Sequence, residues 1–154
     1  MIVNTKRFGQ VQVAEDQLVT FIKPILGFED FKSYFIMNSE GNEGSFEFLQ
    51  SVEDENLTFI VMDPFAFFSD YEFQLKSDWI DTLHLEGDQD VRVLVIVTVR
   101  SESEITCNLK APIIINKKNR FAAQIVLEQG KYATRQPLIA LEKGAGSNAD
   151  SIQK

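Results

Sequence analysis

The chain has 154 residues but only one cysteine, one histidine and 15 lysines and arginines. Because Cys107 has no second cysteine to pair with, a reducing compartment is indicated. A structural zinc site would have to depend on carboxylates, whereas such sites favour cysteine and histidine. Aspartate and glutamate total 23, which gives a net charge of −8. Nucleic-acid binders concentrate positive charge, so no direct binding of DNA or RNA is expected, and a basic protein partner is favoured.

No apolar run is long enough for a membrane span. The longest, residues 91–99, has nine residues and contains Arg92, whereas a spanning helix needs about 20. The N-terminal MIVNTKRFG has no apolar region typical of a signal peptide. We therefore expect a cytoplasmic protein with no membrane partner. A single domain is expected over residues 1–143, followed by a flexible tail at 144–154.

Sequence motifs for catalysis are missing. No GxSxG elbow accompanies the single histidine, His84, which is interpreted as an ordinary surface or boundary residue. The lone GxG of Gly144 and Gly146 lies in the polar tail, away from any strand–helix pair that dinucleotide binding requires. Asp88 and Asp90 lack the spacing of a calcium loop and are expected to be solvated turn carboxylates. The sequence therefore predicts no enzyme activity, no metal and no cofactor.

Short runs rich in valine, isoleucine, phenylalanine and tyrosine recur along the chain, separated by turn residues such as Gly41, Asn42 and Gly44. This spacing predicts an all-β fold, either a small sandwich or a barrel. Residues 91–99 are apolar on both alternating faces, which is typical of a strand buried on both sides. The predicted strands are 11–13, 18–22, 34–37, 46–49, 57–62, 71–75, 91–99, 113–115 and 121–127.

Only two stretches favour helix. Ser77 is expected to cap a short helix that ends at Leu83, with Trp79, Ile80 and Leu83 facing inward. Residues 28–32 are expected to form another single helical turn.

Charge is distributed unevenly along the chain. Residues 29–104 contain 18 acidic and 4 basic residues, a net of −14, whereas residues 105–135 contain six basic residues and one acidic residue, a net of +5. If the fold separates these segments, one face is strongly acidic and would attract a basic protein. The alternative, a surface on which the charges are mixed, is equally compatible with the sequence.

Ten of the 13 phenylalanines lie between residues 28 and 73, and most are expected in the core. The segment 63–71 is different, because three phenylalanines within four residues cannot all point the same way. Pro64 marks the end of a strand. At least one of Phe65, Phe67 and Phe68 is then a candidate for contact with a partner, although burial in the core is the alternative for each ring.

Several motifs, taken in order, make the sequence similar to the FliW family over residues 2–141. Any one motif is weak, and the order and spacing together are fairly specific. The motifs are Pro24-x-x-Gly27-Phe28 followed by Phe31, Phe46-x-Phe-Leu-Gln-Ser51, Leu57-x-Phe followed by Asp63-Pro64 and Tyr71, the run Ile105-Thr-Cys-Asn108-Leu-Lys-Ala-Pro112-Ile-Ile-Ile-Asn116, and Gln124.

The resemblance implies a mainly antiparallel, β-barrel-like fold with one or two short helices. It also implies a non-enzymatic flagellar assembly factor with two protein partners, the translational repressor CsrA (carbon storage regulator) and flagellin. Binding of CsrA would relieve repression of flagellin mRNA, and exchange of the two partners would couple flagellin synthesis to export. The rival prediction is a small-molecule-binding β-barrel or a carboxylate-based enzyme, which an open, polar-dotted interior would favour.

We expect the repressor to contact the acidic stretch 29–104 near the phenylalanine-rich turn. Charge reversal at Glu53, Asp54 and Glu55 is then expected to weaken binding, more at low salt than at high salt. The segment 108–112 has two interpretations. Asn108 and Pro112 are typical of turn chemistry, whereas Leu109 and Lys110 are the side chains that such a turn would present to a partner.

Overall fold

The computed structural model describes residues 1–38, 46–128 and 130–138. Within these residues the chain forms a two-stranded hairpin and a nine-stranded sheet, accompanied by two short α-helices and two 3-10 turns. The elements are β1 (Ile2–Thr5), β2 (Gly9–Gln12), η1 (Glu15–Gln17), β3 (Leu18–Lys23), β4 (Ser33–Asn38), β5 (Glu47–Ser51), β6 (Thr58–Met62), α1 (Pro64–Phe67), α2 (Ser77–Thr82), η2 (Asp88–Asp90), β7 (Val91–Ser101), β8 (Glu104–Cys107), β9 (Ile113–Asn116), β10 (Phe121–Gln124) and β11 (Gln136–Pro137).

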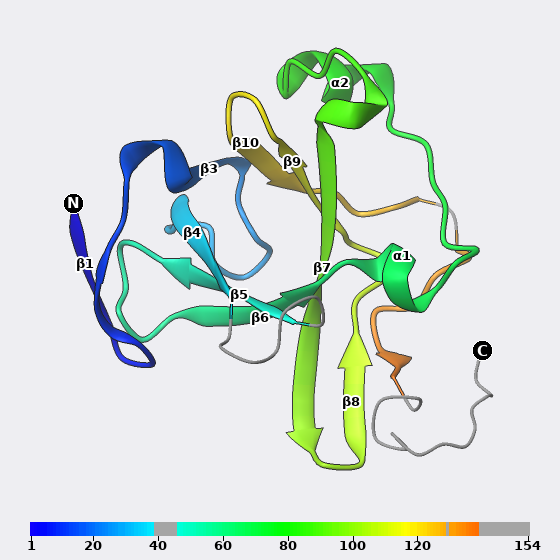
Figure 1. The fold of residues 1–154 in the computed structure, drawn as a ribbon. Helices are drawn as coiled ribbons and strands as arrows, with labels where there is room; N and C mark the ends of the chain where they lie inside the picture. Colours follow the sequence, from blue (N-terminus) through cyan, green and yellow to red (C-terminus); the bar gives the residue numbers. More distant parts are fainter. Residues whose placement is uncertain (39–45, 129, 139–154) are drawn as a thin grey trace.

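The sheet closes on itself. Its strand order is β11-β8-β7-β6-β5-β4-β3-β10-β9, and β9 also pairs with β7. Each pairing is antiparallel except that of β3 with β10. Figure 1 shows the N-terminal hairpin to one side of this sheet, and α2 at one end of the long strand β7. The predicted all-β, mainly antiparallel, barrel-like fold with short helices is confirmed.

Strand β7 changes its surroundings along its length. Leu94 and Val95 at its centre are fully buried, as the prediction of two apolar faces requires. Beyond Val97, β8 is its only pairing partner among the described strands, and Val99 is 52% exposed. The far half of β7 therefore extends from the barrel as a hairpin with β8, and burial on both faces holds only at the centre of the strand.

Large side chains fill the barrel interior. Phe21, Tyr34, Leu49, Val61 and Leu94 form one cluster in which each is at most 1% exposed. The packed centre agrees with the regulator, whereas a pocket of about 310 Å³ that opens beside this cluster, lined by Phe28, Phe59, Arg100 and Gln124 among others, is the kind of cavity that the ligand-binding alternative predicts.

The expectation that most phenylalanines between residues 28 and 73 form the core is confirmed in part, because most of these rings pack against the core clusters without being buried themselves. Phe35 alone among the described ones is fully buried. Except for Phe48 and Phe65, the others pack at the margins of two clusters. Partly buried rings at these margins are Phe28, Phe31, Phe59, Phe46, Phe67, Phe68 and Phe73.

Residues 71–75 are not a strand, contrary to prediction. They run without a partner strand from α1 to α2. Their alternating apolar side chains have another use, because Phe73 and Leu75 pack on the cluster around Leu83, outside the barrel wall. Alternation therefore reports one buried face here, and not strand pairing. Three short strands, β1, β8 and β11, were not predicted because they have few apolar residues.

The two predicted helical stretches have different outcomes. Residues 28–32 form a hydrogen-bonded turn without helix, in which the N–H of Phe31 donates to the Phe28 carbonyl at 3.1 Å. Helix α2 lies where expected, but Lys76, not Ser77, is the N-cap residue and it makes no side-chain cap. Leu83 is buried, whereas Ile80 is 38% exposed because this six-residue helix lies on the outer surface.

The predicted turn at Gly41, Asn42 and Gly44 and the predicted tail at 144–154 lie outside the described residues. Among those that are described, no helix is both long and apolar enough to cross a membrane.

Candidate partner-binding surface

The phenylalanine-rich turn follows β6 and begins with a helix cap. The Asp63 carboxylate accepts the N–H of Phe65 at 2.8 Å, and Pro64 occupies the first helical turn, where it loses no hydrogen bond. The short α1 then places Phe65 at the surface with 45% exposure, while Phe67 and Phe68 are half-buried. The prediction that at least one of these rings is exposed is confirmed.

Tyr71 joins this turn to the segment 108–112. Its hydroxyl donates to the Leu109 carbonyl at 2.7 Å, and its ring lies 5.6 Å from that of Phe65 between centroids. Burial raises the pKa of Tyr71, so the phenol stays protonated and can donate this bond.

The segment 108–112 has a structural role. The Asn108 side-chain oxygen accepts the N–H groups of Lys110 and Ala111 at 3.1 and 3.0 Å. Leu109 is 3% exposed, because it packs with Tyr71 in the cluster beneath the aromatic turn. Presentation of Leu109 to a partner is therefore wrong, whereas Lys110 is half-buried and its contact with a partner stays a prediction.

The acidic turn, Glu53 to Glu55, lies between β5 and β6. The Glu53 carboxylate accepts the N–H groups of Lys32 and Ser33 at 2.8 and 3.3 Å. Asp54 accepts the N–H of Asn56 at 2.9 Å, which closes the turn. This turn precedes β6 whereas the phenylalanine-rich turn follows it, so the two lie at opposite ends of that strand. The structure does not bring together the two surfaces that the sequence prediction combined.

A groove lies beside the phenylalanine-rich turn instead. We call it the α2 groove; its volume is about 730 Å³. It is lined by the extended segment 71–75, by Ile80 of α2 with the segment 85–88 that follows this helix, and by the start of β7. The residues that line it are Phe65, Tyr71, Glu72, Phe73, Gln74, Leu75, Ile80, Leu85, Glu86, Gly87, Asp88, Val91 and Val93. The sequence analysis did not predict this groove. The alternation of Tyr71, Phe73 and Leu75, which line it, is the sequence feature that could have indicated it.

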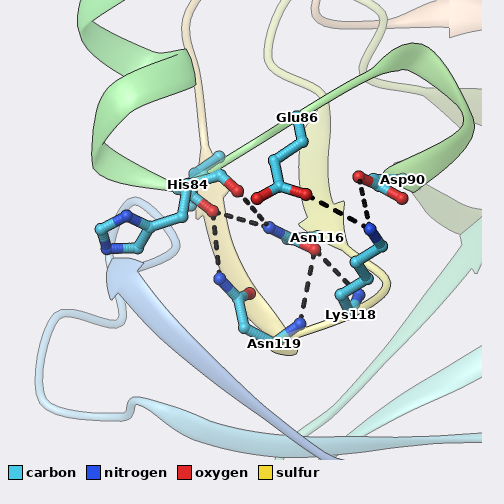
Figure 2. Close-up of polar contacts among 7 residues, drawn as sticks. His84, Glu86, Asp90, Asn116, Lys118 and Asn119 are labelled. Atoms are coloured by element: carbon cyan, nitrogen blue, oxygen red, sulfur yellow. Dashed lines mark hydrogen bonds and ion pairs between the residues drawn. The ribbon is translucent and has the colours of Figure 1, made fainter.

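Asn116 holds one side of the groove in place. Its side-chain amide donates to the carbonyls of Leu83 and His84 at 2.8 and 3.1 Å, and its side-chain oxygen accepts the N–H of Lys118 at 2.8 Å. Asn119 adds a bond to the Leu83 carbonyl at 3.2 Å. Figure 2 shows this network between the β9–β10 turn and the segment after α2.

Lys118 extends the network toward two carboxylates. Its Nζ lies 3.3 Å from Glu86 and 3.6 Å from Asp90 (Figure 2). The hydrogen bond to Glu86, with the charge of Asp90, raises the pKa of Lys118. Asp90 is only 5% exposed, so the prediction of a solvated carboxylate is wrong for it. The reason is tertiary, since the backbone of Asp90 also accepts the N–H of Lys117 at 2.7 Å.

These contacts bear on the charge pattern. Lys118 belongs to the basic segment 105–135, yet it lies against carboxylates of the acidic segment. Glu128 in turn pairs with Lys76 at 2.7 Å. The two segments are therefore interleaved at this side of the barrel, and the carboxylates of Glu72 and Asp88 make no hydrogen bond or ion pair with any described residue.

The reactive residue types lie apart from one another. Burial raises the pKa of the Cys107 thiol to about 12, which keeps it unreactive. His84 is exposed, and Figure 2 shows its imidazole pointing away from the polar network. No group of three histidine, cysteine, aspartate or glutamate side chains within the described part of the chain could hold a metal ion.

Comparison with known proteins identifies the family. The family model described as FliW protein matches residues 2–138. The chain belongs to the FliW family. It is 42% identical over 139 residues to the flagellar assembly factor FliW of Bacillus subtilis, covering 90% of this chain and 96% of that protein. It is 39% identical over 149 residues to that of Treponema denticola, covering 96% and 100%.

A solved structure agrees with the fold. The crystal structure of a flagellar assembly factor FliW superposes with a TM-score of 0.83 at 33% sequence identity. The match covers 90% of this chain and 97% of the other. The resemblance to FliW that the sequence motifs indicated is therefore confirmed.

The FliW motif residues serve mainly to hold the barrel together. The Gln124 side chain accepts the N–H of Leu26 at 2.8 Å and donates to the Ala111 carbonyl at 3.2 Å, so it ties three segments together. Gly27 has φ +88°, a conformation that suits glycine. The Pro112 carbonyl accepts the N–H of Ile125 at 3.0 Å.

Phe28 follows this glycine and packs edge-on against Phe59, with ring centroids 5.0 Å apart. This contact seals one margin of the interior cluster.

Proposed function

We propose that this chain is a flagellar assembly factor that acts in the cytoplasm by binding other proteins and not by catalysis. The observation that carries the proposal is the FliW match over residues 2–138, together with relatives named flagellar assembly factor that align along most of their own length. The packed cluster at the centre of the barrel supports a role carried out at the surface.

The proposed partners are the CsrA-type translational repressor and flagellin. Binding of the repressor would release flagellin mRNA, and flagellin would compete for or displace the repressor as its own level changes. Two features support this pair. The net charge of −8 suits a basic partner, and a repressor must be basic where it holds RNA.

Charge also suggests how repression would be relieved. A protein with excess carboxylates repels RNA phosphates when it is bound near an RNA-binding surface. The repressor complex would thus exclude RNA both by covering protein surface and by electrostatic repulsion. We expect repressor binding to strengthen as salt is lowered, because the Debye length lengthens from about 8 Å at 0.15 M salt to about 30 Å at 0.01 M salt.

Isothermal titration calorimetry tests this function. The chain is titrated with the CsrA-type repressor and, separately, with flagellin from the same bacterium. Saturable binding to each partner is expected, and the second partner should reduce the apparent affinity for the first if they share a surface. Absence of heat together with absence of co-elution for both partners would contradict the proposal.

A further inference from the structure

We propose that the α2 groove is the docking site for a basic, amphipathic segment of the repressor. This inference rests on the proposed function for the identity of the partner. It adds the place of contact and the chemistry of the segment that is bound. The apolar side of that segment would enter the groove, and its lysines or arginines would pair with the carboxylates along the rim.

The groove offers apolar contact surface that the fold leaves uncovered. Phe65 is 45% exposed and Ile80 is 38% exposed, and both line the groove. Phe73 and Leu75 are half-buried on its wall. Large aromatic and aliphatic side chains in a concave setting are the usual energetic centre of a protein interface.

The rim supplies charge complementarity. Glu72, Glu86 and Asp88 line the groove and are exposed. Glu86 already pairs with Lys118, whereas Glu72 and Asp88 have no cation partner among the described residues. No lysine or arginine lines the groove. An apolar groove rimmed by carboxylates selects a segment that is apolar on one face and basic on the other.

The wall carries backbone groups that a partner can use. The N–H groups of Phe73, Gln74 and Leu75 donate to no carbonyl or side chain within the described ranges. N–H groups without a protein partner bond to water, and a bound segment can replace that water. Opposite them, the Asn116 network fixes the segment that carries Glu86 and Asp88. Because one side of the groove is already fixed, less conformational entropy is lost when a partner binds.

The first experiment compares two matched charge reversals. The variant E72K/D88K changes the rim, and E102K/E104K makes the same change in net charge on exposed residues at the β7–β8 turn. That turn lies about 30 Å from the groove along β7. Binding to the repressor is measured by calorimetry at 0.15 M salt, where charges this far apart are screened. E72K/D88K should weaken binding about tenfold or more, and E102K/E104K less than about twofold.

A second pair of variants tests the apolar part. I80S removes an exposed groove side chain, and V99S removes an exposed side chain from the far half of β7. I80S should weaken binding about fivefold and V99S not measurably. Hydrogen exchange gives a direct readout, since the amides of residues 73–75 should exchange quickly in the unbound chain and become protected by the repressor.

The outcomes separate the two proposals. Failure of the unchanged chain to bind the repressor would overturn the proposed function and the occupant assigned to the groove. Normal binding by the unchanged chain, with equal affinity in E72K/D88K and no new protection at 73–75, would overturn the groove alone. Loss of flagellin binding in E72K/D88K with the repressor unaffected would assign the groove to flagellin and overturn this proposal too.

Discussion

The acidic turn at 53–55 and the rim of the α2 groove carry the same chemical groups in different circumstances. At the turn, the Glu53 and Asp54 carboxylates accept backbone N–H groups from the chain itself. At the rim, Glu72 and Asp88 contact no cation or donor of the described chain. The carboxylates are denser in the sequence at the turn, where three are consecutive, but two of those three already accept hydrogen bonds from the fold. Availability, not charge alone, decides which carboxylates can serve a partner.

The largest effect on stability is expected when the hydrogen bonds that hold one side of the α2 groove are removed. Asn116→Ala would leave the Leu83 and His84 carbonyls without their strongest donor. The free energy of unfolding should fall by about 2 kcal/mol, since buried polar groups are costly when unsatisfied. Urea denaturation measures the stability, and calorimetry should show weaker repressor binding at a temperature where the variant is folded. Unchanged stability would mean that the network does not hold the rim.

Charge reversal at the turn tests directly which of the two acidic sites contacts the repressor. E53K/E55K is expected to weaken repressor binding about twofold at 0.15 M salt and less at higher salt, through the loss of long-range attraction, with a small added cost in stability from the exposed Glu53 hydrogen bonds. E72K/D88K should have the larger effect at each salt concentration. If the turn variant loses more affinity than the rim variant, the contact is at the turn, where the sequence first placed it.

Two tyrosine hydroxyls allow the same comparison, between a group that the fold has paired and one that it has not, without a change of charge. The Tyr71 hydroxyl donates to the Leu109 carbonyl, whereas the buried Tyr34 hydroxyl has no hydrogen-bond partner among the described residues. Tyr71→Phe should lower the free energy of unfolding by about 1 kcal/mol, and Tyr34→Phe should leave it unchanged or raise it slightly. Equal losses in thermal denaturation of the two variants would contradict this reading of the contacts.

The smallest effect is expected at Glu53. Glu53→Gln keeps an oxygen that can accept the N–H groups of Lys32 and Ser33, and Glu53→Ala removes it. The alanine variant should be less stable than the glutamine variant by about 0.5 kcal/mol, because the bonds are exposed. A more stable alanine variant would show that this carboxylate has no structural role.

Much of the barrel could be predicted because its central strands are continuous apolar runs. Residues 91–99 and 113–115 have few other ways to be buried, and both are strands in the structure. Residues 71–75 instead alternate apolar and polar side chains, as a half-buried strand does, yet they cover the outside of the barrel wall without pairing. Periodicity reports which side of a segment is buried, and only the packed fold decides what buries it.

The candidate site was harder to predict for a geometric reason. Only nine residues separate Glu55 from Phe65 in the sequence, but strand β6 lies between them and places them at its two ends. Conversely, Asp90 is buried because Lys117 and Lys118, distant in sequence, return beside it. The fold thus separates residues that are close in sequence and brings together residues that are distant in it. A local sequence pattern does not report these tertiary distances.

The one parallel pairing in the barrel has a consequence for synthesis of the protein. Strand β3 pairs with β10, so Thr20 lies opposite Phe121, about 100 residues later in the chain. While the ribosome is still adding the intervening residues, β3 lacks this neighbour and β7 lacks β9, and both edges are open to mispairing. The barrel can close only after residue 124 has left the exit tunnel, so folding is completed late in translation or after release.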